Sequence, residues 1–152
     1  MNPDPEFELL LRGAPARFQA AARYVWEWIP GAVREDLRRG WLPRKPLLMV
    51  VPDLAAEAGR PFLGCYQPET GAMFFDRRAV ERLEDWVLVA VICHELAHAW
   101  RAVRGLGRGA SESADEEATR LTAAGWGFAD PEHLPPPQTT RRRPALKGTR
   151  RW

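Results

Sequence analysis

The sequence has little cysteine, no long apolar run and no internal repeat. Its two cysteines, Cys65 and Cys93, cannot form the disulfide framework of a small secreted protein, so we expect inert, buried thiols and a reducing, cytoplasmic location. The longest apolar run, residues 86–93, is far shorter than the roughly twenty residues of a membrane-spanning helix, so we expect no membrane span. The acidic N-terminus predicts no secretory signal.

The composition is that of a globular protein, with 45% hydrophobic and 28% charged residues. A chain of 152 residues holds one domain with one modest core. The net charge of +2 is unevenly spread, because residues 141–152 contain six Arg and Lys and no acid, so the rest carries −4. We therefore expect a single domain over residues 1–130 and a Pro-rich, basic and disordered tail over residues 131–152.

The first half of the chain predicts helices followed by short strands. Apolar side chains recur at helical spacing over residues 15–29, and a shorter helical stretch covers residues 33–39. Residues 47–51 form a short, partly β-branched run next to proline, which favours a buried strand, and we take it as the central strand. Residues 62–66 and 72–75 flank a turn that contains Pro and Gly, and this pattern predicts a hairpin.

The second half predicts two helices. A helical pattern covers residues 77–104, with a break near Glu84, and the glycines that follow end it. Ser113 and Glu116 have the spacing of a capping box, in which the two side chains accept hydrogen bonds from each other's backbone N–H groups. A short helix is therefore predicted from Ser113 to about Gly125.

The most specific motif is His94-Glu95-Leu96-Ala97-His98, an HExxH sequence inside the long helix. Imidazoles four residues apart lie one turn apart on one face and can share a tetrahedral Zn²⁺ at about 2.0–2.1 Å. Glu95 can then take a proton from a zinc-bound water whose pKa the metal lowers toward about 7. The alternative is a coincidental pair of helix histidines. The apolar sequence around the pair argues against coincidence, because a metal gives buried imidazoles a partner.

A catalytic zinc needs a third protein ligand and an open position for water. The extended motif of the metzincins, with a third histidine close behind, is absent. The nearest group of carboxylates consists of Glu112, Asp115, Glu116 and Glu117. The ordinary alternative for Glu117 is a solvated acid in the first turn of a helix, and the capping box accounts well for Glu116.

Together with the preceding helix and short sheet and the following acidic helix, the HExxH motif resembles the minimal gluzincin metallopeptidases. It is similar to the ImmA/IrrE-type small domains over residues 15–128. The resemblance implies a zincin-like α+β fold: an N-terminal helix, a small mixed sheet of about three strands with an edge hairpin, an HExxH active-site helix and a short ligand helix. It also implies a third ligand that directly precedes a small residue, which Glu117 matches, ahead of Glu116 and then Asp115 or Glu112. Helical spacing agrees, because Glu117 and Leu121 would share a face turned toward the core.

The resemblance also implies an edge strand that binds an extended peptide beside the metal, and the hairpin is the candidate. We therefore expect a zinc metalloendopeptidase that acts on a peptide or protein substrate. Tyr66 is a candidate to stabilise an oxyanion, although a packing role is the stronger expectation, and His133 is expected to be a solvated tail residue.

Two other functions stay open at this point. One is a catalytically inactive, zinc-stabilised interaction domain. The other is a nucleic-acid-associated metalloprotease whose basic residues 141–152 contact phosphates, for which a plain disordered terminus is the ordinary alternative.

Overall fold

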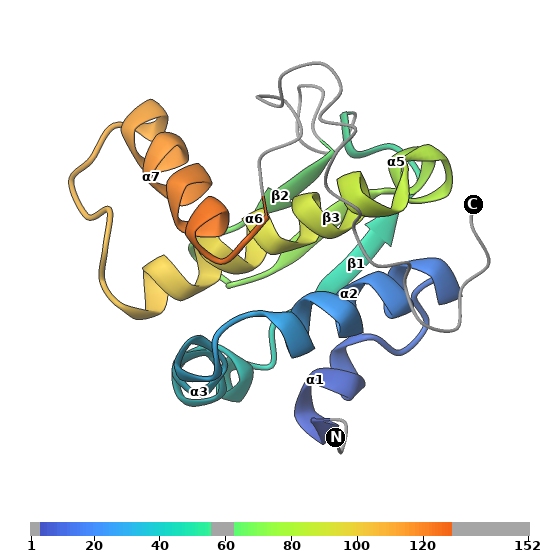
Figure 1. The fold of residues 1–152 in the computed structure, drawn as a ribbon, viewed down its shortest axis with the longest axis horizontal. Coiled ribbons are helices and arrows are strands. Elements are labelled where there is room, and N and C mark those ends of the chain that lie inside the picture. The colour runs from blue at the N-terminus through green and yellow to red at the C-terminus, as the bar shows by residue number, and fades with distance from the viewer. Residues whose placement is uncertain (1–3, 56–62, 129–152) are drawn as a thin grey trace.

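A computed structural model describes residues 4–55 and 63–128, and Figure 1 shows their arrangement. The helices are α1 (Pro5–Leu10), α2 (Ala16–Trp28), α3 (Gly31–Gly40), α5 (Arg77–Arg82), α6 (Asp85–Val103) and α7 (Glu112–Gly125), with a 3-10 turn η1 (Leu42–Arg44). The strands are β1 (Leu48–Val51), β2 (Gly64–Tyr66) and β3 (Met73–Asp76). The expected α+β class with a small mixed sheet is confirmed. The predicted tail, with its basic residues and His133, lies outside the described residues.

The sheet has the order β1-β3-β2, with β1 parallel and β2 antiparallel to β3. The predicted hairpin is confirmed, and it closes through a hydrogen bond from the Gln67 N–H to the Ala72 carbonyl at 2.8 Å. The prediction of β1 as the central strand is wrong. Its apolar residues suited a buried strand, but β3 pairs on both sides and leaves β1 and β2 as the two edges.

The predicted break in the long helix is confirmed, because α5 ends at Arg82 and α6 begins at Asp85. Arg17 of α2 supports this junction, since its guanidinium donates to the carbonyl of Val80 at 2.6 Å and to that of Leu83. Helix α1 was not predicted. Asp4 caps it by accepting a hydrogen bond from the Glu6 N–H at 3.2 Å, and such a cap leaves no trace in the apolar periodicity of the sequence.

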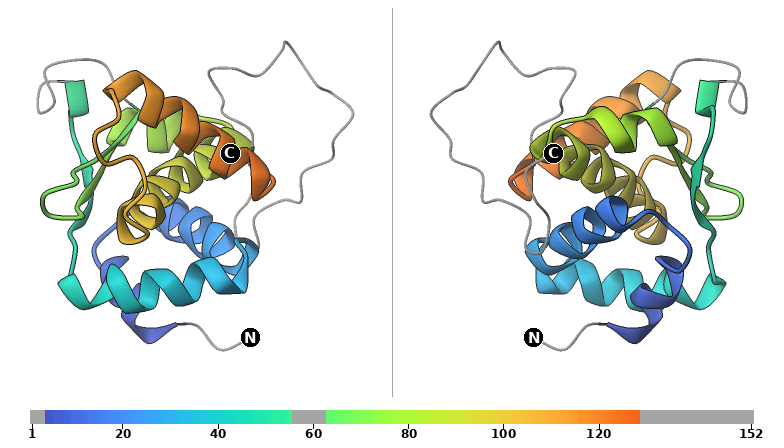
Figure 2. Two further views of the ribbon diagram at one scale, coloured as in Figure 1. Left: turned by 90° about the vertical axis from the view of Figure 1, so that its left-hand side faces the viewer. Right: turned by 90° about the vertical axis from the view of Figure 1, so that its right-hand side faces the viewer.

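Helix α6 lies at the centre of the molecule, in contact with α2, α3, α7 and β2. Figure 2 shows the sheet along one side and the helices packed on one of its faces. By length and composition alone α6 is the one candidate membrane span in the described part of the chain. This is a weak indication, because core helices meet the same criterion and 56% of the apolar stretch of α6 is buried. The contacts of α6 with β2 and with α7 place the HExxH residues between the sheet and α7.

Candidate metal centre

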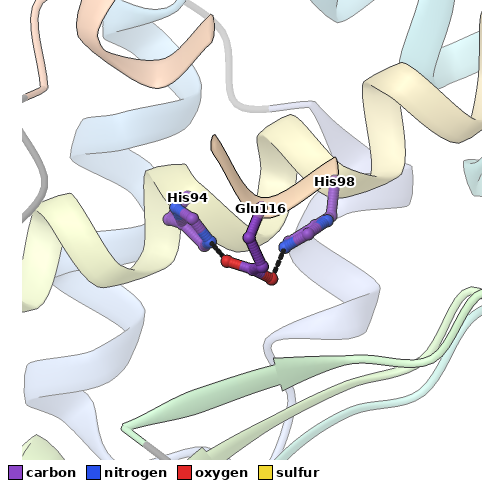
Figure 3. Close-up of side chains that lie close together, drawn as sticks. All are labelled: His94, His98 and Glu116. Atoms are coloured by element: carbon purple, nitrogen blue, oxygen red, sulfur yellow. Dashed lines mark hydrogen bonds and ion pairs between the residues drawn. The ribbon is translucent and has the colours of Figure 1, made fainter. Parts of the chain in front are cut away.

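Two imidazoles and one carboxylate converge between α6 and α7 (Figure 3). His94 Nε2 lies 3.0 Å from Glu116 Oε2, and His98 Nε2 lies 2.7 Å from Glu116 Oε1. The rings of the two histidines are nearly perpendicular, with centroids 4.9 Å apart. One potential ligand atom from each of the three residues falls within 4.8 Å of the others. Within residues 4–55 and 63–128, these three side chains form the group suited to holding a metal ion.

The start of α7 explains why Glu116 occupies this position. Ser111 is the N-cap, and its hydroxyl accepts a hydrogen bond from the Ala114 N–H at 3.2 Å. The predicted capping box of Ser113 with Glu116 is therefore wrong, since the helix begins at Glu112. Glu116 has no capping role and its carboxylate faces the histidines instead.

The structure does not bring Glu117, the preferred third ligand, to the histidines. Its carboxylate pairs with Arg120 on the same helix, at 3.0 Å from the guanidinium Nε. The helical face expected to turn inward with Glu117 is solvated at Leu121, which is 57% exposed. The buried face instead carries Thr119 and Ala123, three and seven residues after Glu116. A shift of one residue turns a side chain by about 100° around a helix, which separates the two glutamates.

Glu95 lies in α6 beside the pair of histidines and is 5% exposed. Burial raises its pKa to about 6, an effect that the nearby histidines partly oppose. Its Oε2 atom is buried and has no hydrogen-bond partner among the described residues. The backbone of β2 approaches closely, because a Cβ added at Gly64 would lie 3.2 Å from Glu95 Oε1. Glu95 is thus held against the sheet, and one of its buried oxygens has no hydrogen-bond partner among the described residues.

A cleft passes over these residues. It is bordered by β2, by the loop after α6 and by the first turns of α7, and its lining includes His94, Glu95, His98 and Glu116. The contacts of the Glu116 carboxylate with His94 and His98 hold its pKa well below the ordinary range. The two imidazole nitrogens and this carboxylate are ligand types that zinc prefers, so the residues present fit a zinc ion.

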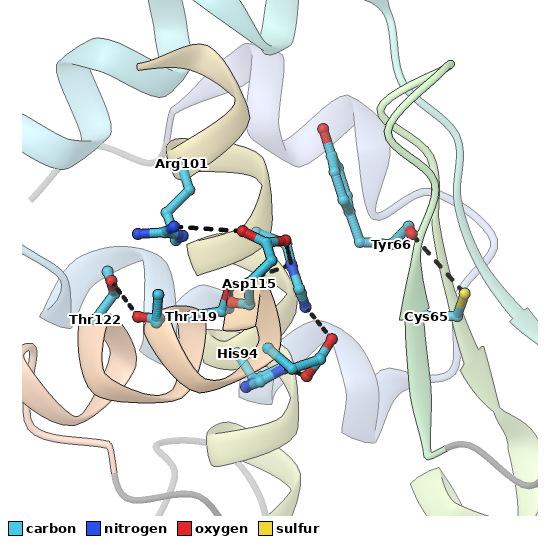
Figure 4. A network of polar contacts seen from close by, with 10 residues as sticks. Cys65, Tyr66, His94, Arg101, Asp115, Thr119 and Thr122 are labelled. Atoms are coloured by element: carbon cyan, nitrogen blue, oxygen red, sulfur yellow. Dashed lines mark hydrogen bonds and ion pairs between the residues drawn. The ribbon is translucent and has the colours of Figure 1, made fainter. Parts of the chain in front are cut away.

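Tyr66 packs on the site through its ring. The ring stacks on that of His98, with centroids 5.9 Å apart and planes within 5° of parallel. Its hydroxyl points away from His94 (Figure 4), and burial raises its pKa. These contacts describe a packing residue, and an oxyanion role for Tyr66 stays a prediction. Cys93 is a buried free thiol, as expected, whereas Cys65 is only half-buried and lines the cleft.

Sequence reasoning named Asp115 as a candidate ligand but not as a neighbour of His98, and it missed the roles of Arg101 and Thr119 behind that imidazole. Asp115 Oδ2 lies 3.8 Å from His98 Nδ1, and Asp115 Oδ1 lies 3.3 Å from the Arg101 guanidinium. The Thr119 hydroxyl lies 3.3 Å from the same imidazole nitrogen. Extending the helical face of Glu116 by one turn would have indicated Thr119.

Comparisons of this chain with known protein families, with characterised proteins and with solved structures find no match.

Proposed function

We propose that this protein is a zinc-dependent peptidase, with His94, His98 and Glu116 as ligands and Glu95 as general base. The observation that carries the proposal is the meeting of two imidazole nitrogens and a carboxylate beside a buried glutamate with an unpaired oxygen in the described part of the chain. Chance placement rarely puts a glutamate in such a position without a partner, because burying an unpaired polar atom costs about 1–3 kcal/mol.

A bound zinc ion would supply Lewis-acid activation of a water molecule and of the scissile carbonyl. Glu95 would take the proton released by that water. A pKa of about 6 suits this role, because the carboxylate is mostly ionised at neutral pH and still basic enough to accept a proton. Glu95 would then deliver the proton to the nitrogen of the leaving amine. Because Glu95 is 5% exposed, its burial would limit the access of competing water to this transfer.

The sheet supports a peptide or protein as the substrate. Among residues 4–55 and 63–128, strand β2 pairs with β3, and its residues Gly64, Cys65 and Tyr66 line the cleft. An extended peptide could add to this edge through backbone hydrogen bonds, which require no particular substrate sequence. Such pairing would hold a carbonyl of the substrate above the histidines. The hydrolysed peptide bond would then lie inside the substrate, as in an endopeptidase.

The test compares Glu95→Gln with the matched variant Glu117→Gln. We expect Glu95→Gln to retain stoichiometric zinc but to lose at least about 100-fold in cleavage of a fluorogenic peptide library, since a general base contributes about 10²–10⁴-fold. Glu117→Gln should keep both properties, because Glu117 pairs with Arg120 outside the metal group. Glu116→Gln should weaken zinc binding. Full activity of Glu95→Gln, or a wild-type protein that takes up no zinc, would contradict the proposal.

A zinc-stabilised interaction domain is the second candidate. The ligand set comes from two helices, α6 and α7, so a shared ion would tie them together. Under this function zinc would raise the melting temperature in wild type and in Glu95→Gln alike, and neither protein would cleave peptides. The proposed nucleic-acid contact through residues 141–152 lies outside the described residues and stays a prediction.

A further inference from the structure

Thr119 is a fully buried polar residue in α7, with 0% of its surface exposed. Figure 4 shows Thr119 beside Asp115 in α7. The Thr119 hydroxyl oxygen lies 2.7 Å from the backbone carbonyl oxygen of Asp115 and 3.3 Å from His98 Nδ1. The hydroxyl therefore connects the backbone of α7 to the edge of an imidazole whose other nitrogen faces Glu116.

The hydrogen-bonding capacity of the hydroxyl decides which imidazole nitrogen carries the hydrogen. A carbonyl oxygen can only accept, so the single hydroxyl hydrogen is donated to Asp115. Toward His98 the hydroxyl oxygen can then only accept, so Nδ1 is the donor. When a cation takes the place of the direct contact between Nε2 and Glu116, an imidazole that keeps its hydrogen on Nδ1 presents the lone pair of Nε2 to that cation.

We propose that Thr119 is a positioning residue for the metal centre, holding His98 in the tautomer and orientation that present the Nε2 lone pair to a divalent cation. The inference rests on the proposed zinc site and names a residue that acts through a ligand. The ring of Tyr66 fixes the face of the imidazole by stacking, and Thr119 fixes its edge. Outer hydrogen bonds of this kind commonly determine ligand orientation.

The charges near the same nitrogen favour this arrangement. The Asp115 carboxylate, whose oxygens accept hydrogen bonds when ionised, also faces His98 Nδ1, at 3.8 Å. Arg101 holds the carboxylate in place at 3.3 Å. The 3.8 Å separation is too long for a hydrogen bond, which leaves the Thr119 hydroxyl as the direct acceptor among the described residues.

The same helix supplies a matched control. Thr122 donates its hydroxyl hydrogen to the Ala118 carbonyl at 2.8 Å, the same bond to the residue four positions earlier that Thr119 makes. In the described part of the chain its hydroxyl bonds to no histidine. Thr119→Val and Thr122→Val therefore remove the same group from the same helix, and only the first removes a contact to His98.

The experiment measures zinc affinity by competition with a chromophoric chelator in the full-length protein. We expect Thr119→Val to bind zinc about 10–100-fold more weakly, the usual effect of losing an outer partner of a ligand histidine. Thr119→Ser should restore the affinity to near that of wild type, and Thr122→Val should leave it unchanged. A purely structural role would lower the melting temperature of the zinc-free Thr119→Val protein without changing its zinc affinity.

The outcomes separate this inference from the proposed function. Wild-type zinc affinity in Thr119→Val, or failure of Thr119→Ser to restore it, overturns the role of Thr119 and leaves the peptidase proposal intact. A wild-type protein that binds no zinc overturns both. Should Thr119→Val not fold, Thr119→Ala removes the same hydroxyl with a smaller side chain. The same loss of zinc affinity is expected of it, and wild-type affinity would overturn the role of Thr119.

Discussion

The burial of Glu95 leads to a prediction about stability that is independent of catalysis. In the zinc-free protein its pKa is about 6, against an ordinary value of 4.5 in the unfolded chain. The folded state therefore binds this proton more tightly, and the resulting stabilisation is present below pH 4.5 and is lost as the pH rises through 6. At 1.36 kcal/mol per pKa unit, the lost free energy of unfolding is about 2 kcal/mol.

Glu95→Gln should remove this loss, because the amide keeps the shape of the protonated acid and never ionises. Relative to wild type, the variant should gain about 2 kcal/mol in free energy of unfolding between pH 4.5 and pH 7, or roughly 4–8 °C in melting temperature. Urea denaturation of both zinc-free proteins at several pH values measures the difference. Taking the difference cancels the titration of histidines that both proteins share. A gap that does not change with pH, or that shrinks as the pH rises, would refute the reasoning.

Three further predictions concern residues around the site and the core. Gly64→Ala would place a Cβ 3.2 Å from Glu95 Oε1. We therefore expect zinc binding to persist while peptide cleavage falls about tenfold or more. The control is Gly125→Ala, where a Cβ meets nothing within 4 Å, and it should leave cleavage unchanged. Asp76→Ala removes the cap of α5 and should lower the free energy of unfolding by about 1–2 kcal/mol, as measured by urea denaturation. Trp41→Phe leaves the Gly71 carbonyl without its buried donor at 2.9 Å and should cost about 1–3 kcal/mol, seen as a lower melting temperature. Unchanged stability in Asp76→Ala or in Trp41→Phe would contradict that prediction and show that water replaces the lost hydrogen bond.

The tight packing at Gly64 and the burial of Glu95 point to a compromise between stability and reactivity. An ionised carboxylate in this position destabilises the folded chain, and a neutral residue there would favour folding. The same burial raises its basicity and leaves Oε2 without a partner among the described residues, which are the properties that a general base requires. A residue retained only for packing would give neither effect.

By itself the sequence determined the features that depend on local geometry. The spacing of His94 and His98 places their side chains on one face of a helix, because the α-helix repeats every 3.6 residues. The hairpin and the break before α6 were also readable, since turn residues and apolar periodicity act over a few neighbouring positions. The HExxH motif and most helices needed no tertiary information.

Only the tertiary structure decided what meets the histidines. The choice between Glu116 and Glu117 depends on the rotation of α7 about its axis, which is set by the contacts of Glu116 and Thr119 with the histidines of α6. These are contacts between residues about twenty positions apart, and a local pattern cannot fix them. One residue of register changes the direction of a side chain by about 100°, so the third candidate ligand and the partner of His98 emerged only when the two helices were packed together.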